Sequence, residues 1–285
     1  MNEFLKSLSN RETALFVWVL VILGILILKK KIRKSILAVV KAFFKKKLLI
    51  LFISFMFYVA LCFFILFKVG FWDNSLIKDS VFWTFGFASL TIFNINKAKS
   101  KAYFKLIFID ALKWTVMIEF IMSFYTFSLR IEFIILPIVT FAIVMQTFSK
   151  TNTEYKQVDN LMNRFLSVIG IIIFAYVIFK TFTLWSALMT TDNLKSFLLP
   201  VIMTILFMPF IYVLALFMQY EELFVRLDFL SKDKVQQIKV KRQILQIANI
   251  DLDRLMNISR NIAKKLLIDK ECSFEAIKKI SQKLN

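Results

Sequence analysis

Ionisable residues inside apolar stretches are the clearest candidates for chemistry in this chain of 285 residues. Asp110 and Lys113 are spaced i, i+3, and Glu119 follows them in the run WTVMIEFIMSFYTF, while Lys180 lies in a later apolar run. A charged side chain at bilayer depth is costly, so it normally faces a partner charge, a helix bundle or water. We therefore expect these four residues to be intramembrane polar or pore-lining residues.

Each of these residues allows a structural interpretation beside the functional one. The spacing of Asp110 and Lys113 favours an ion pair near one headgroup layer. Glu119 has no near cation in its own run, so it either pairs with Lys180 or lines an aqueous path. Arg130 and Glu132 flank a predicted turn between two apolar runs, and we expect them to pair at the membrane surface.

Most other catalytic chemistry is excluded by composition. The chain has no histidine, only four glycines and two cysteines, Cys62 and Cys272. Histidine acid–base catalysis, histidine or cysteine metal sites and glycine-rich phosphate loops all need residues that this sequence lacks. We predict that the protein is not an enzyme and has no metal site and no cofactor.

The elements that hold these residues are predicted to be membrane-spanning helices. The chain is 59% hydrophobic, its mean hydropathy is +0.71, and a helix of ~20 apolar residues crosses a bilayer. The fold class is predicted to be an all-α, polytopic helical membrane protein with six or seven spans. The apolar runs cover residues 13 to 28, 48 to 67, 81 to 96, 106 to 129, 133 to 148, 165 to 184 and 197 to 218.

The distribution of charge predicts the orientation of the spans. With seven spans, the segments 1 to 13, 68 to 80, 130 to 132 and 185 to 196 share one side, and each has zero net charge. The opposite side then carries the whole net charge of +19. Because cytoplasmic loops are rich in Lys and Arg, we predict that the N-terminus lies outside and the C-terminus in the cytoplasm.

The most basic segment is KKKIRKSILAVVKAFFKKK, residues 29 to 47, with nine cations and no anion. At helical spacing Ile32, Ile36, Val40 and Phe43 share one face, and lysines occupy the other. We predict an amphipathic helix in the transmembrane domain, residues 1 to 220. Two interpretations stay open: the helix binds anionic lipid, or it adds to a basic field that attracts a polyanion such as nucleic acid.

A second domain is predicted from residue 221 to residue 285, where charged residues alternate with apolar ones at helical spacing. Its first helix is expected to continue the last span as far as KVKRQILQI, with further helices from about Asp251 to Ile268 and after Ser273. The second helix has an apolar face of Leu252, Leu255, Met256, Ile262 and Leu266. The candidate ligand-binding cations of this cytoplasmic domain are Lys239, Lys241, Arg242, Arg254, Arg260, Lys264 and Lys265.

Two stretches carry a resemblance to known proteins. They are SFYTFSLRIEFIILP, residues 123 to 137, and LLPVIMTILFMPFIYVLALFMQYEELFVRLDF, residues 198 to 229. They resemble a widespread, mostly uncharacterised family of bacterial polytopic membrane proteins. The layout of several spans and a basic helical tail is similar to that of transmembrane effectors in anti-phage defence such as the Hailong effector, which implies a bacterial inner membrane with a periplasmic N-terminus. That resemblance implies an oligomeric ion channel gated by short DNA that a partner nucleotidyltransferase makes.

Three hypotheses for function remain at this point. The first is a homo-oligomeric ion channel or pore-forming effector that is gated by a cytoplasmic anionic ligand, with a short oligonucleotide or nucleotide as the candidate. The second is a membrane scaffold or assembly protein that transports nothing. The third is a secondary transporter that uses Glu119 for proton coupling.

Overall fold

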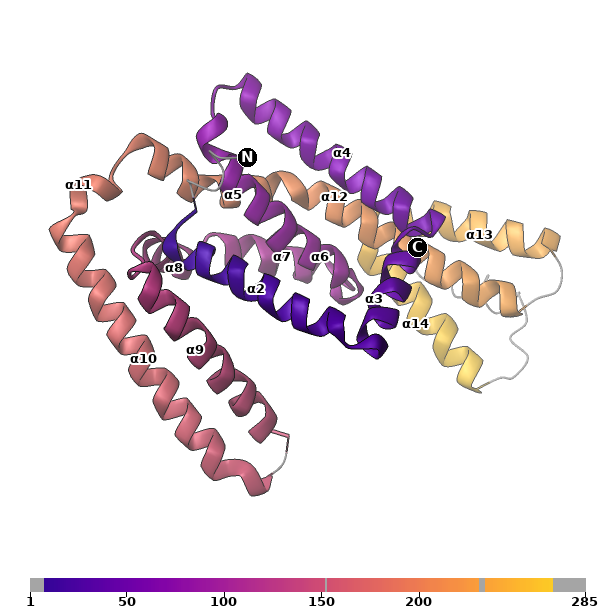
Figure 1. The fold of residues 1–285 in the computed structure, drawn as a ribbon. Coiled ribbons are helices and arrows are strands. Elements are labelled where there is room, and N and C mark those ends of the chain that lie inside the picture. The colour runs from indigo at the N-terminus through magenta and orange to yellow at the C-terminus, as the bar shows by residue number, and fades with distance from the viewer. Residues whose placement is uncertain (1–7, 152, 231–233, 269–285) are drawn as a thin grey trace. The chain divides into compact units, whose positions relative to one another are not determined.

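The computed structural model describes residues 8 to 151, 153 to 230 and 234 to 268, and over these residues the protein is all-α (Figure 1). A π-helical segment, Trp83–Ala88, lies between α5 and α6. The α-helices in chain order are α2 (Asn10–Leu28), α3 (Lys30–Phe43), α4 (Lys46–Lys68), α5 (Ile77–Phe82), α6 (Ser89–Phe93), α7 (Lys101–Ala111), α8 (Trp114–Phe124), α9 (Leu129–Ser149), α10 (Lys156–Thr183), α11 (Trp185–Leu188), α12 (Thr191–Leu230), α13 (Lys234–Ala248) and α14 (Leu252–Ile268).

Six helical segments among the described residues are long and apolar enough to cross a membrane. The predicted fold class, a polytopic helical membrane protein, is therefore confirmed. Six of the seven apolar runs correspond to these segments. The segments are Asn10–Leu28, Lys46–Lys68, Asn74–Phe93, Leu129–Ser149, Lys156–Thr183 and Thr191–Asp228.

The remaining apolar run, residues 106 to 129, does not form one helix, so the expectation of a single uninterrupted span there was wrong. Helix α7 ends at Ala111, and α8 begins at Trp114 and ends at Phe124. Between them Lys113 adopts an extended conformation with φ −69° and ψ 148°, which no α-helix allows. Neither half reaches the ~20 residues that a continuous span requires.

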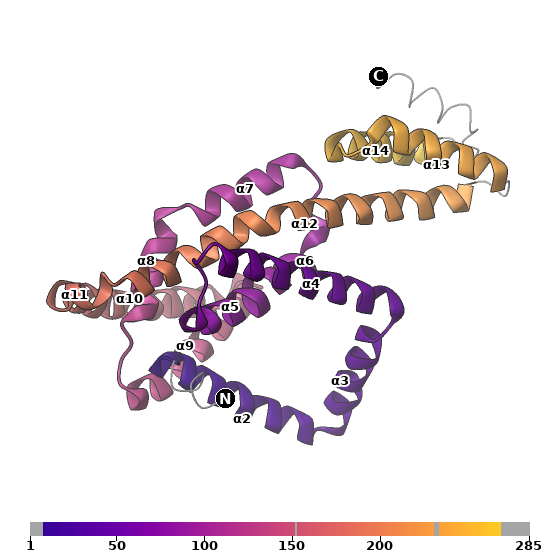
Figure 2. The same ribbon diagram turned by 90° about the horizontal axis from the view of Figure 1, so that it is seen from above.

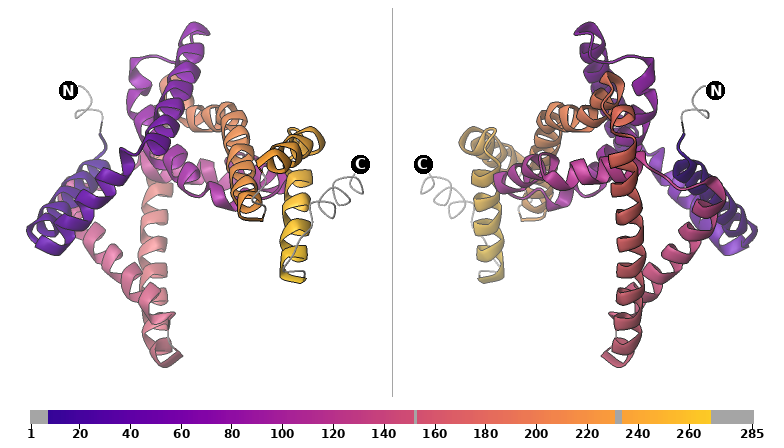
Figure 3. Two further views of the ribbon diagram at one scale, coloured as in Figure 1. Left: turned by 90° about the vertical axis from the view of Figure 1, so that its right-hand side faces the viewer. Right: turned by 90° about the vertical axis from the view of Figure 1, so that its left-hand side faces the viewer.

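The chain divides into two compact units. Unit 1 comprises the described residues of Met1–Ser80 and Lys113–Pro200, and unit 2 those of Val81–Leu112 and Val201–Asn285. In unit 1, α9 and α10 form an antiparallel hairpin (Figure 3). Phe127, just before α9, stacks on Tyr176 of α10 with ring centroids 4.2 Å apart, which fixes one end of that hairpin.

Three ion pairs join four distant segments at one end of unit 1, which we call the ion-paired end. The segments are residues 8 to 13, 73 to 80, 125 to 132 and 184 to 195, close to the four that the sequence grouped by zero net charge. A hydrogen bond of 3.0 Å from the Tyr125 hydroxyl to the Leu184 carbonyl adds a further link. The ion pairs are Arg11–Glu132 at 3.2 Å, Lys78–Glu12 at 3.5 Å and Lys195–Asp73 at 2.8 Å.

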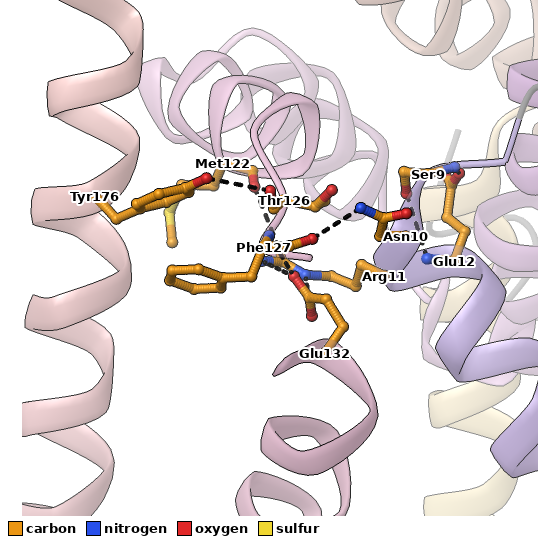
Figure 4. A network of polar contacts seen from close by, with 9 residues as sticks. All are labelled: Ser9, Asn10, Arg11, Glu12, Met122, Thr126, Phe127, Glu132 and Tyr176. Atoms are coloured by element: carbon orange, nitrogen blue, oxygen red, sulfur yellow. Dashed lines mark hydrogen bonds and ion pairs between the residues drawn. The ribbon is translucent and has the colours of Figure 1, made fainter. Parts of the chain in front are cut away.

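The Arg11–Glu132 pair is the most deeply buried of the three (Figure 4). The Glu132 side chain is 2% exposed, and its Oε1 also accepts a hydrogen bond of 3.0 Å from the Phe127 backbone N–H. Arg11 donates a further bond of 3.2 Å to the Met122 carbonyl at the end of α8. The partner of Glu132 is thus Arg11, so the expected pairing with Arg130, whose side chain is exposed, was wrong.

In unit 2 the end of α12 and the helix α13 form an antiparallel hairpin, and α14 packs beside α13 (Figure 2). Helix α12 continues the last span to Leu230, as predicted, but the chain then folds back and α13 is a separate helix. The expected extension through KVKRQILQI was therefore wrong. Both helices of the hairpin carry buried apolar side chains; they are Leu223 and Leu227 of α12 and Val240, Ile244 and Ala248 of α13.

The predicted faces of the second tail helix are confirmed over its described side chains. Leu252, Leu255, Met256 and Ile262 are buried in α14, and Arg254 and Arg260 are exposed. The Leu266 side chain and the predicted helix after Ser273 lie outside the described residues. The division into domains at residue 220 stays a prediction.

Residues 29 to 47 contain the predicted amphipathic helix as α3, which has no buried residue in the chain taken alone. Ile32, Ile36 and Phe43 are partly covered, and the Phe43 ring packs edge-on against Phe52 with centroids 5.1 Å apart. The lysines of α3 are exposed. Anionic lipid and a polyanionic ligand both stay open as partners for this helix.

We predict that Arg11→Met destabilises the protein by about 3 kcal/mol, because it leaves the Glu132 carboxylate buried without its cation. Unfolding of the purified protein in detergent, followed by circular dichroism, measures the loss. Arg130→Met is the matched control and should change stability by less than about 0.5 kcal/mol, since its side chain is exposed. Equal stability of Arg11→Met and Arg130→Met would contradict the assigned role.

Candidate functional site

The break between α7 and α8 is the first part of the candidate site. Leu112 closes α7 with a tight hydrogen bond of 3.1 Å from its N–H to the Ile109 carbonyl. The next N–H that bonds within α8 is that of Val116, to the Lys113 carbonyl at 3.0 Å. The regular i to i−4 pattern is thus interrupted at Leu112 and Lys113, and backbone polar groups there need partners other than the helix.

The order of the helices bears on whether this broken segment crosses the membrane. Helix α2 starts at the ion-paired end, and the segment that follows α4 returns to it. Helix α9 also starts there, because Glu132 binds Arg11. Helices α7 and α8 lie between the span Asn74–Phe93 and the start of α9. A seventh crossing by this stretch stays a prediction.

The helices on either side of the break are each too short to cross a bilayer alone. Helices α7 and α8 have 11 residues each, so each is about 16 Å long, against about 30 Å of hydrocarbon. Asp110 precedes the break and Lys113 lies in it, and their pairing near a headgroup layer stays a prediction. Non-helical backbone at membrane depth is tolerated only where it is covered by protein or lines water.

Side chains at the break are exposed. Leu112 is 56% exposed, and the side chains of Asp110 and Lys113 are exposed as well.

The other two intramembrane residues contribute less to this site. Glu119 belongs to α8, but its side chain lies outside what the structure describes, so its pairing with Lys180 stays untested. Lys180 belongs to the last turn of α10, and its Nζ lies 5.9 Å from the centre of the Tyr176 ring, a cation–π contact.

The second part of the site is a set of contacts between the tail and the start of α7, which we call the tail clamp. Lys101 Nζ lies 2.9 Å from Asp251 Oδ2, and the Lys101 backbone N–H donates to Asp253 Oδ1 at 3.1 Å. Asp253 thus caps the free N-terminus of α7, where a negative charge is favourable. The first turn of α14 is attached directly to the helix that ends at the break.

The turn between α13 and α14 is also fixed to the last span. The Tyr212 hydroxyl donates to the Ile250 carbonyl at 2.7 Å, and the Tyr220 hydroxyl donates to the Asn249 carbonyl at 2.6 Å. Asn249 has φ +44°, a left-handed conformation that asparagine tolerates better than most residues. The Tyr212 ring also packs edge-on against Phe104 of α7, with centroids 5.2 Å apart.

Hydrogen bonding stabilises the charged form of Asp251. The Lys101 ammonium, and then the N–H groups of Arg254 and Asp253, hold the pKa of this carboxyl below its usual value of 3.8. A lowered carboxyl pKa stabilises the folded state above the unfolded pKa, and this contribution is lost as pH falls through the folded pKa. The clamp should therefore be intact at any pH above about 4.

The predicted ligand-binding cations of the tail fall into three groups. Arg254 and Arg260 lie on the exposed face of α14, and Lys239 and Arg242 are exposed on α13. Lys241 is partly neutralised, because its Nζ lies 2.6 Å from Asp228 Oδ1 and 5.5 Å from the Phe224 ring centre. Lys264 and Lys265 belong to α14, but their side chains lie outside what the structure describes.

Sequence reasoning missed Lys101, Asp251 and Asp253 as functional candidates. The pattern Asn249-Ile250-Asp251-Leu252-Asp253 contains a signal for a helix stop followed by a helix start. It does not reveal that the acidic side chains also reach α7, which is 150 residues away in the chain.

Comparison of the chain with models of known protein families, with curated proteins and with solved structures finds no match. In the part of the chain that the structure describes, no three His, Cys, Asp or Glu residues are grouped so that they could hold a metal ion. The assignment of function therefore depends on the break and the tail clamp.

We predict that the double variant Asp251→Asn/Asp253→Asn increases hydrogen exchange at the backbone amides of residues 101 to 105 several-fold, because the cap of α7 is weakened. Exchange followed by mass spectrometry on protein in detergent measures this directly. Asp228→Asn, which breaks the Lys241 pair in the same unit, is the control and should leave those amides unchanged. Unchanged exchange in the double variant would show that the clamp does not hold α7.

Proposed function

We propose that this protein is a subunit of a homo-oligomeric ion channel or pore-forming effector, whose ion path passes the break between α7 and α8. The observation that carries the proposal is the non-helical break at Leu112 and Lys113, with Leu112 exposed, between two apolar helices that are each too short to cross a bilayer alone. Asp110 and Lys113 beside it supply charged groups, which are costly at this depth unless water or a partner charge meets them.

Assembly of several copies would place the surface at Leu112 against water or another subunit. Leu112 is 56% exposed, and non-helical backbone at membrane depth is tolerated only against protein or water. In a ring of identical subunits the crossings α7 and α8 would line a shared aqueous centre, while the long apolar helices would face lipid and neighbouring copies. This arrangement has closed symmetry, as most homo-oligomers do.

The tail clamp provides a route from ligand to pore. Arg254 Nε lies 3.9 Å from Asp251 Oδ2, so an anion bound at Arg254 would compete with this carboxylate for the guanidinium. The same anion would repel Asp251 and Asp253, which hold Lys101. Binding is therefore stronger when the clamp is open, and this difference in affinity is what allows a ligand to shift the equilibrium.

The proposed ligand is a short oligonucleotide or nucleotide that binds the cations of the tail. The full surplus of +19 lies away from the four zero-charge segments, and phosphates are attracted to such a basic region. By the rule that cations favour the cytoplasm, the tail is cytoplasmic and the N-terminus periplasmic in a bacterial inner membrane. The resemblance of residues 123 to 137 and 198 to 229 to Hailong-type effectors suggests anti-phage defence and a partner nucleotidyltransferase.

A secondary transporter is the second candidate, and the break in α7–α8 is the observation that favours it. Discontinuous helices form the substrate sites of many carriers, generally as a pair in two related halves. Glu119 of α8 would then be the proton-coupling residue. The long helix α12 is continuous from Thr191 to Leu230 and so forms no second break. One broken helix fits a channel better than a carrier, which would need two.

We predict that the purified protein in planar bilayers passes ion current when short DNA is added on the side of the tail. Arg254→Glu/Arg260→Glu should raise the DNA concentration needed by at least about tenfold and reduce the slope of log K against log salt by about 1.4, for two single-strand phosphate contacts. Lys150→Glu/Lys156→Glu makes the same change of charge on exposed residues outside the tail and should behave as wild type.

Other outcomes separate the rival functions. Saturable exchange of a solute without unitary currents would reject the channel and support the secondary transporter. Absence of both current and flux under every ligand would leave a scaffold or assembly protein. Current that responds equally to DNA in the tail variant and in wild type would retain the channel and reject the tail as its ligand site.

A further inference from the structure

Unit 1 contains a cavity of about 480 Å³ close to its ion-paired end. Four elements build it: α2 contributes Glu12, α5 contributes Lys78 and Asp79, and α8 and α12 form the remaining walls. Its volume is typical of sites that bind small molecules, about 300 to 1,000 Å³. The cavity uses neither the break at Leu112 nor the tail clamp.

The charges that line the cavity sum to one negative charge. Glu12 and Lys78 neutralise each other through an ion pair of 3.5 Å, and each side chain is 24% exposed. Asp79 is the carboxylate in excess, and the Ser196 hydroxyl donates a hydrogen bond to it. A ligand that enters this cavity therefore meets a net negative charge, that of the Asp79 carboxylate.

Aromatic rings also line the cavity. Phe120 and Phe124 of α8 and Phe197 of α12 line the cavity, and the rings of Phe120 and Phe197 pack edge to face with centroids 5.3 Å apart. Aromatic faces attract cations and also bury apolar groups. One excess carboxylate and three rings in the same cavity are the combination that suits an ammonium group attached to an apolar body.

We propose that this cavity is a binding site for a small organic ammonium ion, with the ammonium at Asp79 and the apolar body against Phe120, Phe124 and Phe197. An organic anion would be repelled by the excess carboxylate. A lipid tail would remove water from Glu12, Lys78 and Asp79 without replacing their hydrogen bonds, which is costly. A bare metal ion would meet rings over much of the wall where it needs oxygen ligands. The site is independent of whether the chain conducts ions.

Isothermal titration of phenethylammonium into the wild-type protein in detergent micelles tests the proposal. We expect saturable binding, weakened at least about tenfold in Asp79→Asn, which keeps the shape of the side chain but removes its charge. Asp192→Asn is the matched control, because it makes the same change in an exposed residue of α12 that does not line the cavity, and it should bind as wild type.

Two further titrations use the wild-type protein alone, so the test does not depend on the folding of a variant. Phenylacetate, which carries a negative charge on a similar body, and the uncharged 2-phenylethanol should both bind at least about tenfold more weakly than phenethylammonium. Absence of saturable phenethylammonium binding, equal binding by Asp79→Asn, or equal binding of phenylacetate would each overturn the site.

Discussion

The buried ion pair between Arg11 and Glu132 is the interaction on which the arrangement of this protein depends. It joins α2 to the start of α9, and through the Met122 carbonyl Arg11 also holds the end of α8. The Glu132 side chain is 2% exposed. Removing the cation from such a buried carboxylate strongly destabilises the folded state. This pair therefore places three chain segments at one end of unit 1.

Ion pairing at this end is one part of the uneven distribution of charge along the chain. Cations there are paired with anions from other segments, as Lys195 is with Asp73. Hydrogen bonds from Lys195 and Ser75 lower the pKa of Asp73 to about 2. The cations of α3 are exposed, and its segment contains no anion to balance them. The tail combines both patterns, because Lys101 is paired with Asp251 while Arg260 is exposed. Paired charges can hold a structure together, and exposed ones can attract a ligand.

The sequence predicts the parts of the fold that depend on local pattern. Apolar length identified six spans, and helical spacing identified α3 and the two faces of α14. It did not predict the break at Leu112, because the residues around it are as apolar as those of a continuous helix, with no Pro or Gly to mark a stop. Nor could it choose Arg11 over Arg130 as the partner of Glu132, since such pairing depends on tertiary contacts. The clamp residues were missed for the same reason.

The accessibility of the break to water is the most direct test of the central claim, that α7–α8 is an exposed, water-lined crossing. In a chain with Cys62 and Cys272 replaced by Ser, Leu112→Cys in native membranes should react with a charged, membrane-impermeant thiol reagent. Phe57→Cys and Ile171→Cys, at exposed positions near the middle of the long helices α4 and α10, should react only with a lipid-soluble reagent. Protection of the thiol in Leu112→Cys to the same degree as the thiol in Phe57→Cys would contradict the account.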